Sequence, residues 1–146
     1  MNREILLAKI KSEASNCGEH PPVVELDDFF QENRQEDSIA PNQVGYGRPS
    51  LSDLYQRFRS IRDRDDVDAV LVSLHDEWED ALDCEDLWPA GDCIHIYTSA
   101  RQAEVEGWIE GLCADGAISG WQRGRGDHPV APQVPVKSKI YTVVWD

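Results

Sequence analysis

The sequence predicts an α+β fold: a small single domain with one mixed β-sheet of about four strands packed against helices. A length of 146 residues is typical of one domain, and 40% hydrophobic residues with five tryptophans can form a real core. Segments with helical periodicity also alternate with short runs of β-forming residues. We expect residues 1–49 to form a helical N-terminal arm with a loop, and residues 50–146 to form the α+β core domain.

The expected N-terminal arm contains two helices and a long loop. Apolar side chains recur at helical spacing over residues 3–14, and the segment His20-Pro-Pro ends that helix because proline lacks a backbone donor. Residues 25–32 predict a second helix, with a leucine and two phenylalanines at i, i+3 and i+4. Residues 34–49 contain prolines and glycines without periodicity, which predicts a loop. This pattern is compatible with an arm that packs on the core and with one that does not.

The clearest helix begins after Pro49, where Ser50 or Ser52 is a suitable N-cap. This helix presents an apolar face at helical spacing, made of Leu51, Leu54, Tyr55, Phe58 and Ile61.

Residues 67–75 also match helical spacing, but their centre is rich in β-branched residues, and we interpret them as a strand.

A second central strand is expected over residues 92–98, after a turn at residues 89–91. Alternation along a strand places Cys93, His95 and Tyr97 on one face and two isoleucines on the other. These two strands would form the centre of the sheet.

The C-terminal third predicts one helix and two more strands. Thr98 or Ser99 can cap a helix that extends to Cys113, although two glycines within it weaken it. Residues 117–121 and 139–145 are rich in β-formers, and the segment between them is a loop rich in glycine and proline.

The net charge of −14 limits the partners that we expect. A field of this sign repels phosphate, and the four arginines of residues 57–64 are followed at once by aspartates, so we expect neither nucleic acid nor a membrane as partner. No segment reaches the roughly 18 apolar residues of a membrane span, and the N-terminal apolar run is too short for a signal peptide. We therefore expect a cytoplasmic protein whose four cysteines are free thiols.

Residues 76–86 are the most distinctive segment, because they contain seven carboxylates and no positive charge. Apolar residues interrupt the acids, which is not typical of a solvated tail, and we therefore expect a folded surface that binds a basic protein partner. Trp78, Leu82 and Trp88 are candidate apolar anchors for that partner. The predicted partner-binding residues are Asp76, Glu77, Trp78, Glu79, Asp80, Asp83, Glu85, Asp86 and Trp88.

Two other interpretations of this charge and of the central strands stay open. Asp exceeds Glu and Arg exceeds Lys, a bias that can reflect the composition of the host, in which case carboxylates would be spread evenly over a housekeeping domain. The second alternative is a small enzyme or ligand-binding domain, with its site on the face of Cys93, His95 and Tyr97 near His75.

No motif in the chain has the spacing of a catalytic, cofactor or metal site. His75, Cys84, Cys93 and His95 are suitable zinc ligands by type, but they lack the close pairs that structural zinc sites show. A nucleophile pair of Cys93 with a histidine would need an orienting carboxylate, and Asp92 points to the opposite face of the strand. We predict no metal, no cofactor and no catalytic residue, and we favour a protein that is not an enzyme.

Five segments carry a resemblance to known sequences: Glu25-Leu-Asp-Asp-Phe-Phe-Gln-Glu-Asn, Ser38-Ile-Ala-Pro-Asn, Trp88-Pro-Ala-Gly-Asp, Ile96-Tyr-Thr-Ser-Ala and Tyr141-Thr-Val-Val-Trp-Asp. Together they resemble a group of small uncharacterised bacterial proteins. The resemblance spans most of the chain and implies a compact standalone bacterial domain. It implies no site residues.

Overall fold

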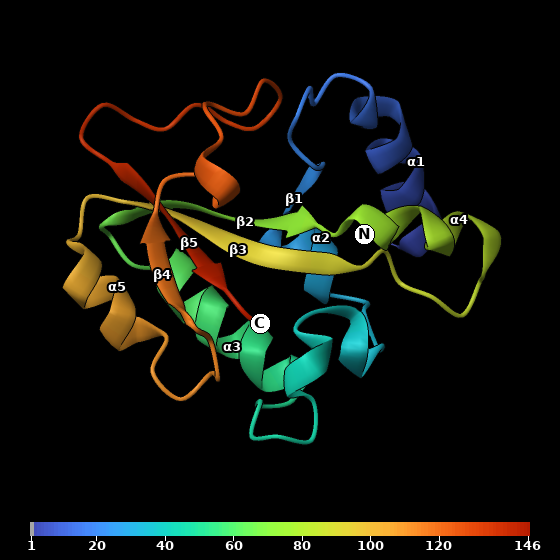
Figure 1. Ribbon diagram of the computed structural model, residues 1–146, viewed down its shortest axis with the longest axis horizontal. Coiled ribbons are helices and arrows are strands. Elements are labelled where there is room, and N and C mark those ends of the chain that lie inside the picture. The colour runs from blue at the N-terminus through green and yellow to red at the C-terminus, as the bar shows by residue number, and fades with distance from the viewer. Residues whose placement is uncertain (1) are drawn as a thin grey trace.

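The computed structural model describes residues 2–146 and contains one antiparallel sheet, with the strand order β1-β2-β3-β5-β4 (Figure 1). The α+β class and the single small domain are confirmed, but the sheet is not mixed and its strands number five. The strands are β1 (Val23–Glu25), β2 (Val67–Leu74), β3 (Gly91–Thr98), β4 (Gly116–Ser119) and β5 (Lys139–Val144).

The connection after β3 explains why a mixed sheet was expected. A helix between two strands is typical of a crossover to a parallel strand, and β4 does run in the same direction as β3. However, β5 returns between them and pairs antiparallel to both. The additional strand, β1, has only three residues, too few for an alternating pattern to be visible.

The helices agree with the apolar periodicity where the pattern is long. The expected helices at residues 3–14 and after Ser50 are α1 and α3, and Ser50 is the N-cap of α3. The last helix is shorter than expected. Its N-cap is Arg101 and not Thr98 or Ser99, and it ends at Trp108, before the left-handed backbone conformations of Gly111 and Cys113. The helices are α1 (Arg3–Ala14), α2 (Leu26–Phe30), α3 (Leu51–Arg62), α4 (Asp80–Asp83) and α5 (Gln102–Trp108).

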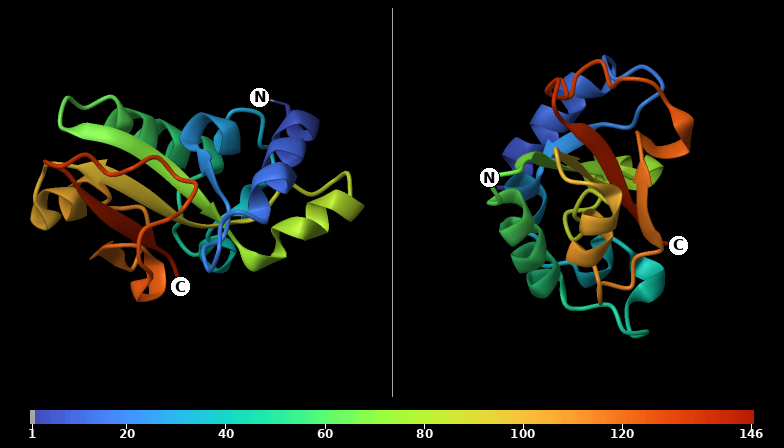
Figure 2. Two further views of the ribbon diagram at one scale, coloured as in Figure 1. Left: turned by 90° about the horizontal axis from the view of Figure 1, so that it is seen from above. Right: turned by 90° about the vertical axis from the view of Figure 1, so that its left-hand side faces the viewer.

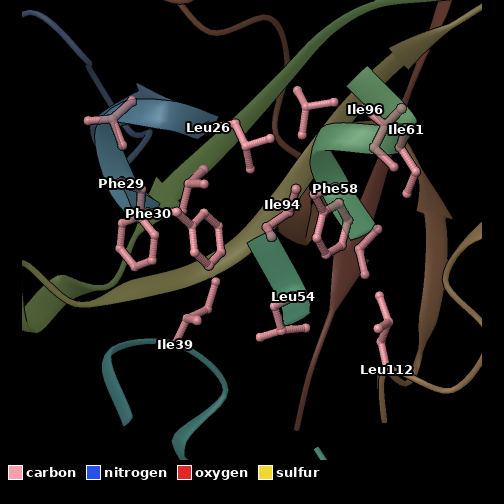
Figure 3. Packing of buried hydrophobic residues seen from close by; sticks show 14 of the residues in the cluster. Leu26, Phe29, Phe30, Ile39, Leu54, Phe58, Ile61, Ile94, Ile96 and Leu112 are labelled. Atoms are coloured by element: carbon pink, nitrogen blue, oxygen red, sulfur yellow. The ribbon is translucent and has the colours of Figure 1, made fainter. Parts of the chain in front are cut away.

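The main hydrophobic core lies between one face of the sheet and helices α1, α2, α3 and α5. Ile94 and Ile96 of β3 belong to this core together with Phe58 of α3 and Phe29 of α2, and Figure 3 shows Ile94 beside Phe58. This placement confirms the expected face of the two isoleucines. Residues 2–49 contribute to both the sheet and the core, because they supply β1 to the sheet and α1 and α2 to the core.

The second face of the sheet is covered by residues 120–138, a long segment without regular strands. Leu71 and Tyr97 of the sheet form a small apolar cluster with Trp121 of this segment. The segment also lies beside residues 17–22, as both views in Figure 2 show, and a hydrogen bond joins His128 to the carbonyl of Pro21. Helices therefore cover one face of the sheet, and a segment without regular strands covers the other.

The helices α1 and α4 lie together at one end of the sheet, while α5 lies at the other end (Figures 1 and 2). The acidic segment, residues 76–86, is at the α1 end. Over residues 2–146, no helix is both long enough and apolar enough to cross a membrane.

Candidate functional site

The acidic segment connects β2 to β3 and is folded as two short helical turns, Asp76–Glu79 and α4. His75 caps the first turn, since its Nδ1 accepts a hydrogen bond from the Glu77 backbone at 3.1 Å. All seven carboxylates of the segment are exposed: Asp76, Glu77, Glu79, Asp80, Asp83, Glu85 and Asp86.

Buried side chains and one arginine hold this segment in place. Trp78 and Trp88 are each only 7% exposed and belong to the main core. From α1, Arg3 reaches across to the segment, where its guanidinium donates to the carbonyls of Leu87 at 2.8 Å and Cys84 at 2.7 Å, and also to that of Ala81. A cation at the end of α4 also stabilises the partial negative charge of its last carbonyls.

The two tryptophans therefore anchor the segment from inside and do not present their rings to a partner. Leu82 is the apolar side chain that the segment does expose, at 41%. Of the residues predicted to bind a partner, the seven carboxylates lie together on the surface, and Trp78 and Trp88 lie beneath them.

Among the described residues, the carboxylates of the acidic segment have no ion-pair partner, because the neighbouring Arg3 donates to backbone carbonyls of the segment and pairs with Glu4. None of its seven carboxylates forms a salt bridge with the cations of residues 2–146. Elsewhere the carboxylates of Asp27, Glu36 and Asp66 each pair with an arginine at 3.0 Å or less. Residues 76–86 therefore present seven carboxylates without an ion-pair partner at one end of the sheet.

The second face of the sheet contains a buried polar network around His95, which is fully buried. Its Nε2 lies 2.5 Å from the Ser73 hydroxyl and its Nδ1 lies 2.8 Å from the Thr142 hydroxyl. Because Thr142 donates its own proton to the Gly120 carbonyl, its oxygen must accept from His95 Nδ1–H. Nε2 is then the acceptor for Ser73, which in turn accepts a bond from Gln122.

This network is suited to holding the sheet together and not to nucleophilic catalysis. Burial lowers the pKa of His95 to about 3, so the ring is neutral, and burial strongly raises the pKa of the Cys93 thiol, 3.8 Å from His95 Nε2. A thiol that stays protonated is a poor nucleophile. Ser73 and His95 are also wholly buried, so a substrate would not reach them.

The face of Cys93, His95 and Tyr97 is formed as the alternation predicts, but His75 does not complete it. His75 follows β2 and its Nδ1 is used to cap the next turn, outside the network of His95. Within residues 2–146, no three His, Cys, Asp or Glu side chains are placed to hold a metal ion together. The four cysteines of the chain are free thiols.

The sequence did not indicate the roles of Arg3, Ser73 and Thr142. Ser73 interrupts an apolar strand and is fully buried, which is a signal for a polar partner on a neighbouring strand. That partner becomes identifiable only from the strand register, which sets Ser73 opposite Cys93 and His95 opposite Thr142. Arg3 carried no sequence signal, since its contacts lie about 80 residues away.

These features define a small single-domain α+β protein whose densest charge is an exposed acidic surface. The chain belongs to the family described as "Uncharacterized protein YfbO", whose model matches residues 1–143. It is similar to the Uncharacterized protein YfbO of Escherichia coli (strain K12), with 30% identity over 147 residues, covering 100% of this chain and 98% of that protein. The resemblance to small uncharacterised bacterial proteins is thereby confirmed. No solved structure matches the chain.

Proposed function

We propose that this chain is a non-enzymatic acidic interaction protein that binds a basic protein partner through residues 76–86. Small immunity proteins and antitoxins, which neutralise a cationic site by covering it, are proteins of this kind. The observation that carries the proposal is the set of seven exposed carboxylates, free of salt bridges, on a segment that buried tryptophans and Arg3 hold in place.

The physical basis is electrostatic steering of the partner onto a surface that is already folded before the partner binds. Complementary charge raises the association rate with a cationic partner, and salt screens the effect. Because Trp78 and Trp88 already pack in the core, the carboxylates do not need a folding step before they bind. The neutral, buried His95 and the protonated Cys93 make a catalytic role for the second face the weaker alternative.

Affinity capture from the host's own lysate tests this proposal. The native chain is compared with a variant in which Asp76, Glu77, Glu79 and Asp80 are replaced by their amides. We expect the native chain to capture a basic protein at low salt, and to lose it as the salt concentration rises. The variant should capture less and show a weaker dependence on salt.

A matched control separates the segment from the overall charge. Replacing Glu19, Asp65, Glu110 and Asp115 by amides removes four exposed carboxylates from other parts of the surface, none with a side-chain salt bridge among the described residues. This control should capture the partner as the native chain does. Equal capture by the native chain and the residue 76–80 variant would refute the proposal, and equal losses in both variants would show that net charge alone is responsible.

A further inference from the structure

A hollow of about 340 Å³ opens in the segment that covers the second face of the sheet, away from the acidic segment. Its lining combines the indole of Trp121, the imidazole of His128 and the carboxylate of Asp127 with an apolar wall that includes Ala131 and Pro132. Ligand pockets typically begin at about 300 Å³, so a hollow of this size suits a ligand with a single ring.

Buried hydrogen bonds fix the shape of this hollow. His128 is 7% exposed; its Nε2–H donates to the Pro21 carbonyl at 3.0 Å, and its Nδ1 accepts from the backbones of Val130 and Ala131, both at 3.1 Å. The Tyr97 hydroxyl donates to the Pro132 carbonyl at 2.7 Å. The wall is therefore tied to the sheet and to the segment before β1, and a ligand would not have to order it.

The ring contacts at the base of the hollow are equally well defined. Trp121 is 5% exposed and packs against His95 with ring centroids 4.5 Å apart, and against Tyr97 at 6.3 Å. Its ring centroid lies 5.4 Å from that of His128. An aromatic base with an apolar wall favours a flat apolar group over a purely polar one.

The charge in the lining of the hollow is negative. Asp127 is the one charged side chain in its lining, is exposed, and has no salt bridge with the cations of residues 2–146. Burial raises the pKa of Tyr97 to about 12, and the carboxylates of Glu25 and Asp127 add to that effect. The same field favours a cation in the hollow and disfavours an anion.

We propose that this hollow binds a small organic cation, with its ammonium group beside Asp127 and a single ring against Trp121 and the apolar wall. The inference concerns a different surface from residues 76–86 and does not depend on the proposed function.

Calorimetric titration of the full chain with benzylammonium tests this proposal, with benzyl alcohol and benzoate as ligands of the same ring and different charge. We expect saturable binding of benzylammonium, binding of the alcohol at least about tenfold weaker, and no binding of benzoate. Asp127→Asn should reduce the affinity for benzylammonium to that for the alcohol. Ala131→Trp, which places a bulky ring in the hollow, should weaken both ligands.

Asp53→Asn on α3 is the matched control, because it removes the same charge from an exposed carboxylate on a helix that covers the other face of the sheet. It should bind benzylammonium as the native chain does. The proposal is overturned if the native chain shows no saturable heat up to about 10 mM, well beyond the millimolar range of weak ligands. It is also overturned if benzoate binds equally well, or if Asp53→Asn weakens binding as much as Asp127→Asn. Asp127 has no side-chain hydrogen bond within the described residues, so its variant should fold and decide the test even if Ala131→Trp does not.

Discussion

Protonation of His95 should destabilise this fold as the pH falls. Burial, and after it the nearby His128 and His20, lower the pKa of His95 from 6.5 to about 3. Below about pH 6.5 the unfolded chain therefore binds a proton that the folded chain does not accept until about pH 3. Stability that is fully present at pH 7 is lost progressively as the pH falls through this window.

The size of the loss follows from the difference between the two pKa values. Each pH unit in this window corresponds to about 1.4 kcal/mol in the free energy of unfolding. We therefore expect His95 to cost the fold about 2 kcal/mol at pH 5 and about 3 kcal/mol at pH 4, relative to pH 7. The network gives a structural reason for this cost, because a proton on Nε2 would remove the acceptor that Ser73 uses.

Urea unfolding followed by tryptophan fluorescence, at pH steps between 7 and 4, measures this effect. His95→Gln removes the titrating ring, and Thr142→Val removes the two hydrogen bonds of the Thr142 hydroxyl but keeps the ring. The carboxylates titrate alike in all three proteins, so differences between their profiles isolate His95. We expect the native chain and Thr142→Val to lose about 3 kcal/mol more than His95→Gln between pH 7 and pH 4. Parallel profiles for the native chain and His95→Gln would refute the reasoning.

Two further predictions concern the packing that supports the sheet and the acidic segment. Gly91→Ala would bring a new methyl within 2.8 Å of the Phe29 ring and should destabilise the fold by about 1–3 kcal/mol in chemical denaturation. Gly107→Ala, whose methyl would meet no atom within 4 Å, should instead be neutral or stabilising by up to about 1 kcal/mol. Arg3→Met should speed amide hydrogen exchange across residues 80–87 while Lys11→Met leaves it unchanged, and equal exchange in both variants would contradict the clamping role of Arg3.

Local sequence patterns predicted the helices and strands that the spacing of their own side chains determines. The helix after Ser50 was predicted with its whole apolar face and with Ser50 as one of two candidate caps, because an amphipathic repeat over twelve residues leaves few alternatives. In β3 the alternation placed two isoleucines in the main core and His95 on the opposite face. In α3 one period accounts for every buried side chain, whereas in β3, which is buried on both faces, it accounts for the face on which each side chain lies.

Sheet topology depended on contacts that no local pattern contains. The strand β1 is short and owes its existence to pairing with β2, from Val23 opposite Ser73 to Glu25 opposite Leu71. The insertion of β5 between β3 and β4 turned a predicted mixed sheet into an antiparallel one. Such pairings are set by the packing of the whole chain, and a single sequence does not display them.

In the candidate site, too, the features set by local sequence were predicted and the features set by long-range packing were not. The count of carboxylates in residues 76–86 was enough to predict an exposed acidic surface, since charges are rarely buried without partners. The positions of Trp78 and Trp88 were not evident, because an aromatic ring among acids is equally consistent with a binding anchor and with a core anchor. Only the burial of both rings in the main core distinguishes these roles.

The burial of these two tryptophans changes the kind of recognition that the acidic segment can support. Hot spots in protein interfaces are typically large aromatic side chains in desolvated pockets, and this segment uses its aromatic rings for its own folding. What it offers a partner is seven fixed carboxylates and one exposed leucine, Leu82. Most of the recognition must then come from charge, so association through this surface should be fast at low salt and strongly weakened at high salt.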